Sequence, residues 1–313
     1  MTFEKEKTVP VKGLLALVII LDHLSFGLKA TVLNVFRALG PPSVSLFLAF
    51  SAYGLYKSYN LKGPIYLKGF FRKRIWKVML PALLATLFYY LILWNPERDL
   101  LQDFKNTFIY GSPPLPQLWF VIVILLFYLV FWFSFRFFGE KGIYGLVLGA
   151  VLLFLWTYKS GFGRNWWITV FAFPTGAFLA KYERPLFSFC EKSFFHWGSL
   201  LATLVILFVV LYILGNPFLW TLCYVIIPIG GVLFFARLPR RVLDNRVLLY
   251  CGAVSYELYL CHQIPIEFFK SSLFPVSSDL VYALLVLTFS FILAITLQII
   301  ISILPDLSSL RRN

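Results

Sequence analysis

The chain has 313 residues, of which 60% are hydrophobic and only 13% are charged. Soluble domains are nearer half apolar and a quarter charged, so this composition excludes an ordinary soluble protein and indicates a polytopic membrane protein. The formal net charge of +14 does not indicate a nucleic-acid partner, because the basic residues lie in short segments between apolar runs.

Ten apolar runs predict an all-α fold of about ten transmembrane helices, since each run is close to the length that crosses a hydrocarbon core. The runs cover residues 12–28, 40–57, 75–94, 117–137, 142–158, 165–180, 197–214, 218–236, 247–269 and 280–304. Only PDLSSLRRN follows the last run, so we expect a single transmembrane domain over residues 1–313 with no appended soluble domain.

The basic residues predict the orientation of this bundle. If the N-terminus is cytosolic, the cytosolic segments hold 21 of the 28 lysines and arginines, and the outer segments hold 7. Such a bias in short loops marks the cytosolic side. We therefore expect a multi-pass protein of the inner (plasma) membrane, with both termini in the cytosol.

The first run carries two ionisable residues, Asp22 and His23, in the segment GLLALVIILDHLSFGL. A helix over this segment would place them roughly 15 Å inside a hydrocarbon core roughly 30 Å thick. A charged group at that depth costs about 2.5 to 3.5 kcal/mol, and such residues normally face a bundle interior or a wet cavity. We interpret them as part of a functional site; the alternative is a polar pair satisfied by a neighbouring helix.

The ninth run, CGAVSYELYLCHQIPIEFF, holds two more ionisable residues. Glu257 is predicted near the middle of the membrane, at the depth of His23, and His262 nearer the outer face. Pro265 lacks the N–H that would bond to the Cys261 carbonyl, so a kink is predicted beside His262. A purely structural polar group is the alternative for each residue.

Basic residues on the cytosolic side predict a phosphate-binding surface. Lys12 precedes His23 by eleven residues, which places both on one helix face roughly 16 Å apart. The loop KGFFRKRIWKVMLP adds Arg72, Arg74 and Lys77 between aromatic residues. Guanidinium groups bind phosphates, and aromatic rings stack on an adenine. Positive-inside bias or binding of anionic lipid is the alternative.

The cysteine and histidine patterns predict neither a metal site nor a disulfide framework. The three histidines are scattered, and no paired spacing connects the four cysteines, Cys190, Cys223, Cys251 and Cys261. We expect these cysteines to behave as small buried apolar residues.

Five segments, in their order along the chain, resemble those of the membrane acyltransferase type 3 family, the group of the bacterial O-antigen and peptidoglycan O-acetyltransferases. They are the Lys12 and His23 pair, SLFLAFSAYGLYKSY, FRKRIWKVMLP, the LWF at residues 118–120, and SYELYLCHQIP. Each segment alone is a weak signal, but together they follow the family's order and spacing, and the resemblance covers nearly the whole chain.

The resemblance implies transfer of an acyl group, usually acetyl, from cytosolic acyl-CoA to a hydroxyl of an envelope or exported carbohydrate. It implies acetyl-CoA as the donor substrate, no metal, and an acceptor that can be lipid-linked. Family members with a soluble domain pass the acyl group to it, so this chain is expected to acylate its acceptor directly or to use a separate envelope partner. The alternative function is a proton-coupled transporter or permease that uses the buried His, Asp and Glu residues.

The resemblance also implies roles for individual residues. His23 maps to the family's helix histidine, and burial favours the neutral imidazole that can act as a general base. Asp22 belongs to the catalytic set but lies about 100° round the helix from His23, so Glu257, at matching depth, is the better candidate to orient the ring. Donor phosphates are assigned to Lys12, Arg72, Arg74 and Lys77. Substrate contacts are assigned to Ser51, Tyr53, Trp119, Tyr256 and His262.

Two positions depart from the family pattern. Lys77 stands where the family has arginine, so the forked phosphate contact would fall to Arg72. The SAYG segment, with Ser51 and Gly54, stands where the family has Ser-Gly-Phe or Ser-Gly-Tyr.

The charge bias makes a prediction about topology. Reporter domains fused to either terminus should lie in the cytosol, and a reporter inserted near residue 105 should lie outside, because loops rich in lysine and arginine are retained inside. Activity of compartment-specific reporters measures this. An external C-terminus would show that the number of crossings is wrong.

Overall fold

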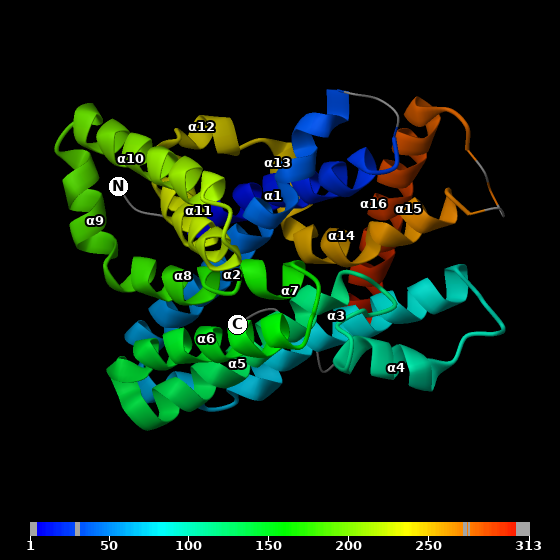
Figure 1. Ribbon diagram of the computed structural model, residues 1–313, viewed down its shortest axis with the longest axis horizontal. Helices are drawn as coiled ribbons and strands as arrows, with labels where there is room; N and C mark the ends of the chain where they lie inside the picture. The colour runs from blue at the N-terminus through cyan, green and yellow to red at the C-terminus, as the bar shows by residue number, and fades with distance from the viewer. Residues whose placement is uncertain (1–4, 29–31, 272–273, 275, 305–313) are drawn as a thin grey trace.

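The computed structural model describes residues 5–28, 32–271, 274 and 276–304, and every regular element in these ranges is a helix (Figure 1). The prediction of an all-α fold is confirmed. The α-helices are α1 (Lys5–Ser25), α2 (Gly40–Lys62), α3 (Phe70–Ile92), α4 (Leu100–Phe108), α5 (Leu118–Phe138), α6 (Gly142–Lys159), α7 (Asn165–Ile168), α8 (Ala172–Lys181), α9 (Glu183–Glu191), α10 (Phe194–Ile213), α11 (Pro217–Arg237), α12 (Arg240–Leu243), α13 (Arg246–Ala253), α14 (Ser255–Cys261), α15 (Gln263–Phe268) and α16 (Asp279–Ile303). Short 3-10 helices are η1 (Val32–Ala38), η2 (Gly63–Leu67) and η3 (Gly139–Lys141).

Within the described ranges, six segments are long and apolar enough to cross a membrane, which makes this an integral membrane protein. They are Lys7–Ser25, Phe70–Ile92, Leu118–Lys159, Phe194–Ile213, Pro217–Arg237 and Asp279–Ile303. The third of these contains both α5 and α6, which pack on each other as a hairpin because Gly142 lies against the backbone of Ser134. Ten crossings and the side of each terminus stay predictions.

Two of the ten predicted runs are interrupted helices. Residues 165–180 form α7 and α8, and residues 247–269 form α13, α14 and α15. The kink predicted beside His262 is confirmed, since α14 ends one residue before it and α15 begins one residue after it. Pro265 explains this break, because it removes a backbone donor from the turn that would have continued α14.

The first helix lies differently from the prediction. It begins at Lys5 and ends at Ser25, so His23 occupies its last turn instead of the middle of a helix over residues 12–28. The chain leaves the helix in a tight turn, in which the Gly27 N–H donates to the Leu24 carbonyl. The side chain of Ser25 donates to the Asp22 carbonyl and completes this helix end. His23 therefore lies near one end of the bundle.

Glycines allow helices around α1 and α2 to pack backbone against backbone. A methyl group on Gly176 of α8 would overlap the Ala49 carbonyl of α2, and one on Gly252 of α13 would overlap the Val9 carbonyl of α1. Small residues of this kind let membrane helices approach closely. The close approach fixes α1 beside α13, and so fixes His23 beside the broken helix that follows.

The course of α2 defines two ends of the bundle. It begins where α1 finishes, at the end that we call the His23 end, and it finishes where α3 begins, at the end that we call the Arg72 end. A helix of 23 residues is roughly 34 Å long. Lys7 donates to the Ala236 and Leu238 carbonyls, which places the start of α1 beside the end of α11 at the Arg72 end.

Candidate active site

Two histidine rings meet where α1 passes the break between α14 and α15. His23 Nδ1 lies 3.2 Å from His262 Nε2 and 2.9 Å from the Ile19 carbonyl oxygen. The ring centroids are 4.9 Å apart. His262 is completely buried, whereas His23 is half-buried.

The hydrogen bonds define which ring nitrogen carries each proton. His262 Nδ1 lies 3.2 Å from the Leu258 carbonyl oxygen, which only accepts, so Nδ1 carries a proton and Nε2 presents a lone pair. His23 Nδ1 faces the Ile19 carbonyl and this lone pair, so it carries a proton as well. The neutral His23 ring then keeps a lone pair on Nε2, the atom that a general base uses.

Gln117 holds the second histidine from the other side. Its side-chain nitrogen lies 3.2 Å from His262 Nε2 and 3.4 Å from Gln263 Oε1. Both of these atoms accept hydrogen bonds, which agrees with an amide nitrogen at this position. Tyr259 donates to the Gln117 backbone carbonyl at 3.3 Å. The residue that precedes α5 is thereby fastened to the broken helix.

A cavity of about 180 Å³ lies beside His23. Its walls come from α1, α2, α5, α14 and the residues around α7, and they include Asp22, Trp119, Tyr259 and Arg164. This volume is below that of ordinary drug-sized pockets, so it suits one small group or ring of a larger substrate. A reacting hydroxyl placed there would lie next to the imidazole.

Asp22 is held at the start of the next helix. Its side chain is only 5% exposed, and it accepts a hydrogen bond from the Gly40 backbone N–H. A methyl group on Gly40 would overlap the carboxylate. Pro41 and Pro42 follow Gly40 and have no N–H. The Gly40 N–H is therefore the donor that the first turn of α2 offers to the Asp22 carboxylate.

A comparison with protein-family models matches residues 11–302 to the acyltransferase 3 family, described as an acyltransferase domain. The chain belongs to the acyltransferase 3 family. Comparisons with curated proteins and with solved structures found no match. The protein is therefore a membrane acyltransferase, and the His23 cavity is its candidate active site.

Glu257 of this acyltransferase 3 member is buried in the first turn of α14 and is not among the residues that line the cavity. The His23 ring contacts the Ile19 carbonyl and His262. The sequence analysis did not expect this contact with His262, and orientation of the ring by Glu257 stays a prediction.

The predicted substrate contacts divide between the two ends of the bundle. Trp119 lines the cavity, and His262 lies behind His23. Ser51 instead contacts the Tyr128 hydroxyl at 3.0 Å, Tyr53 donates to Glu183 at 2.6 Å, and Tyr256 donates to the Val78 carbonyl at 2.8 Å. These three contacts join α2 to α5, α2 to α9, and α14 to α3, and none of the three side chains lines the cavity.

The predicted donor-binding residues lie toward the Arg72 end. Arg72 is exposed near the start of α3, while Arg74 donates to the Tyr66 hydroxyl at 2.7 Å and lies over that ring. Lys77 follows one turn later and is half-buried. Lys12 is half-buried in α1, partway between this surface and His23.

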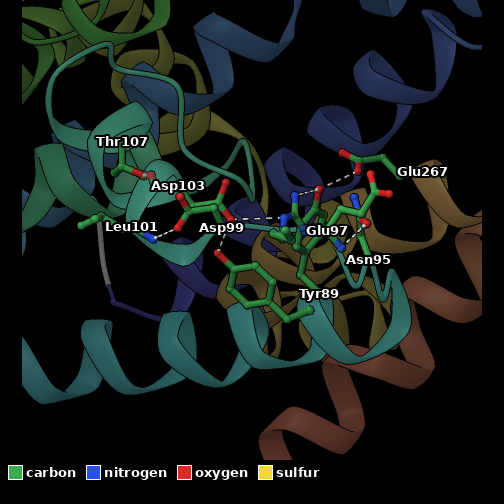
Figure 2. Close-up of polar contacts among 10 residues, drawn as sticks. Tyr89, Asn95, Glu97, Asp99, Leu101, Asp103, Thr107 and Glu267 are labelled. Carbon is green, nitrogen blue, oxygen red and sulfur yellow. Dashed lines mark hydrogen bonds and ion pairs between the residues drawn. The ribbon is translucent and has the colours of Figure 1, made fainter.

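A polar network anchors the segment between α3 and α5 (Figure 2). Tyr89 donates to Glu267 at 2.9 Å, and Arg98 pairs with Asp103 at 3.2 Å. Glu267 also accepts from Gln263, which in turn accepts from Gln117. The helix in this segment is α4, which is capped by Asp99.

Gln117, Tyr259 and Thr169 are among the cavity residues that the sequence analysis did not name. Tyr259 lies inside the SYELYLCHQIP segment, and Gln117 directly precedes the LWF segment. Thr169 had no such signal. Among the described residues, no group of three histidine, cysteine or acidic side chains could hold a metal ion.

His262→Phe should lower turnover about tenfold to a hundredfold, because the His23 imidazolium that forms during proton transfer would keep only the Ile19 carbonyl as an acceptor, and a hydrogen bond to a charged group contributes about 1.5 to 3 kcal/mol. The Michaelis constant for the acyl donor should not change. Steady-state kinetics of the purified variant measure both. His196→Phe, at the start of α10, is the matched control. Wild-type turnover in His262→Phe would contradict this positioning role.

Proposed function

We propose that the protein transfers an acyl group, acetyl in the simplest case, from acyl-CoA to a hydroxyl of an envelope or exported carbohydrate. The observation that carries this proposal is the hydrogen-bonded histidine pair at a small cavity near one end of a membrane bundle. The acceptor can be lipid-linked, and a separate envelope protein can receive the product. The proposed location is the inner membrane.

The donor is assigned to the Arg72 end of the bundle. The phosphates of acyl-CoA carry negative charge, and Arg72, Arg74 and Lys77 offer three cations within two turns of α3. Lys12 lies eleven residues before His23 on α1, roughly 16 Å away along the helix. The extended pantetheine arm would follow this helix face and bring the thioester to the cavity.

The proposed reaction is a direct acyl transfer. The acceptor hydroxyl attacks the thioester carbonyl while its proton passes to His23 Nε2. The new C–O bond forms, the C–S bond breaks, and the CoA thiolate takes the proton back from the imidazolium. Between these steps the charged ring is stabilised by its Nδ1–H bond to His262.

His23→Ala should lower acyl transfer by about 10²- to 10⁴-fold, the usual contribution of a positioned base. Its abundance and thermal stability should stay near wild type, because the substitution removes a polar group from an apolar helix. Transfer of labelled acetyl from acetyl-CoA to envelope glycans measures the effect. His196→Ala serves as the control, and retention of wild-type transfer in His23→Ala would refute this role.

The double variant Arg72→Gln and Arg74→Gln should raise the Michaelis constant for acyl-CoA and leave the acceptor's unchanged. Its donor affinity should also depend less on salt than that of the wild type, because screening weakens only the attraction that these cations supply. Arg240→Gln with Arg241→Gln removes the same charge from α12 and is the matched control. Equal increases of the Michaelis constant in both double variants would show that the net charge of the protein, and not a donor site on α3, determines donor affinity.

A further inference from the structure

Three buried polar atoms without a hydrogen-bond partner belong to residues that line the same cavity. Among the described residues, the buried side-chain atoms left without a partner are Asp22 Oδ1, Gln117 Oε1 and Thr169 Oγ1. Their side chains come from three separate parts of the chain, and all three residues line the cavity beside His23. Asp22 is 5% exposed, Gln117 is 2% exposed and Thr169 is 1% exposed.

Such atoms are unfavourable in a folded protein, because a buried donor or acceptor loses its hydrogen bonds to water. Most buried polar atoms in native structures are paired, and each exception needs an explanation. The three unpartnered atoms all belong to residues of one cavity, which favours a functional explanation over a chance grouping. The explanation is a ligand that supplies the missing partners.

The atoms restrict what this ligand can be. The Asp22 carboxylate and the Gln117 amide oxygen only accept hydrogen bonds, so the ligand must present at least two donors. The orientation of the Gln117 amide is fixed, because its nitrogen faces the acceptors His262 Nε2 and Gln263 Oε1. The Thr169 hydroxyl can both donate and accept, which suits a third group that does the same.

The charges and the opening of the cavity favour a neutral polyol over a cation. Arg164 lines the same cavity as Asp22, so the two side chains bring opposite charges to it. Arg164 and Asn165 are both exposed, which opens the cavity to solvent at the His23 end. A polar substrate can therefore reach it without passing the Arg72 end, where the donor is assigned.

We propose that Asp22, Gln117 and Thr169 form the acceptor subsite, which binds neighbouring hydroxyls of a sugar ring and presents another hydroxyl to His23. This proposal rests on the proposed function and adds to it the residues that select the acceptor.

The first test is ligand binding without any acyl donor. Methyl glycosides of glucose, galactose, mannose and N-acetylglucosamine are added to the purified protein, and thermal unfolding is followed. At least one glycoside should raise the melting temperature of the wild type. Its affinity should fall about threefold to tenfold in Thr169→Val, the loss expected for one hydrogen bond. Tetrahydropyran, a ring without hydroxyls, should have no effect.

Thr157→Val is the matched control, because Thr157 is equally buried but its hydroxyl donates to the Leu153 carbonyl at 2.8 Å. It should bind the glycoside as the wild type does. Without ligand, Thr169→Val should melt at a higher temperature than the wild type, since it removes an unpartnered hydroxyl, whereas Thr157→Val should not. A merely structural Thr169 would not give this opposite pair of effects.

His23→Ala separates this proposal from the proposed function. It should keep the glycoside shift while losing acyl transfer. If no acyl transfer is found but the shift persists and depends on Thr169, the acyltransferase reaction is refuted and the polyol subsite stands. If transfer is normal but no glycoside raises the melting temperature of the wild type, the polyol subsite is overturned and the reaction stands. The same conclusion follows if cyclohexylamine, a ring that carries a cation in place of hydroxyls, raises it instead.

Discussion

The contact between His23 and His262 is the interaction on which the arrangement of the site depends. It joins α1 to the junction of α14 and α15. The His262 N–H still donates to the Leu258 carbonyl, as in an α-helix, so the ring keeps the direction that α14 gives it. Pro265 ends the regular hydrogen bonding just after this residue and does not line the cavity.

Two kinds of packing hold this junction in place. Glycine contacts bring α1 against α13 without a layer of side chains between them, which leaves little freedom to slide. A chain of polar contacts then runs from His262 through Gln117, Gln263 and Glu267 to Tyr89 on α3. In an apolar surrounding such contacts are hard to replace by water, so they specify one arrangement of these helices.

The sequence predicted the helices well because the apolar runs and the helix breakers act locally. It also singled out His23 and the kink at His262, because an ionisable residue in an apolar run and a proline in a helix can each be interpreted without knowing their neighbours in the fold. The contact of His23 with His262 could not be predicted from the sequence, because it depends on how α14 packs against α1. Gln117 and Thr169 are ordinary residues in sequence, and only the folded bundle brings them to one cavity.

An acyltransferase that works with hydroxyls must prefer its acceptor to water, which also carries hydroxyl groups and is far more concentrated. A single hydrogen bond cannot make this distinction, because water satisfies it as well as an alcohol does. Several unpartnered polar groups held at separate parts of the chain can, since one rigid ring satisfies them together, whereas separate waters each lose freedom on binding. The small volume adds to this effect, because a substrate that fills the cavity leaves no room there for water.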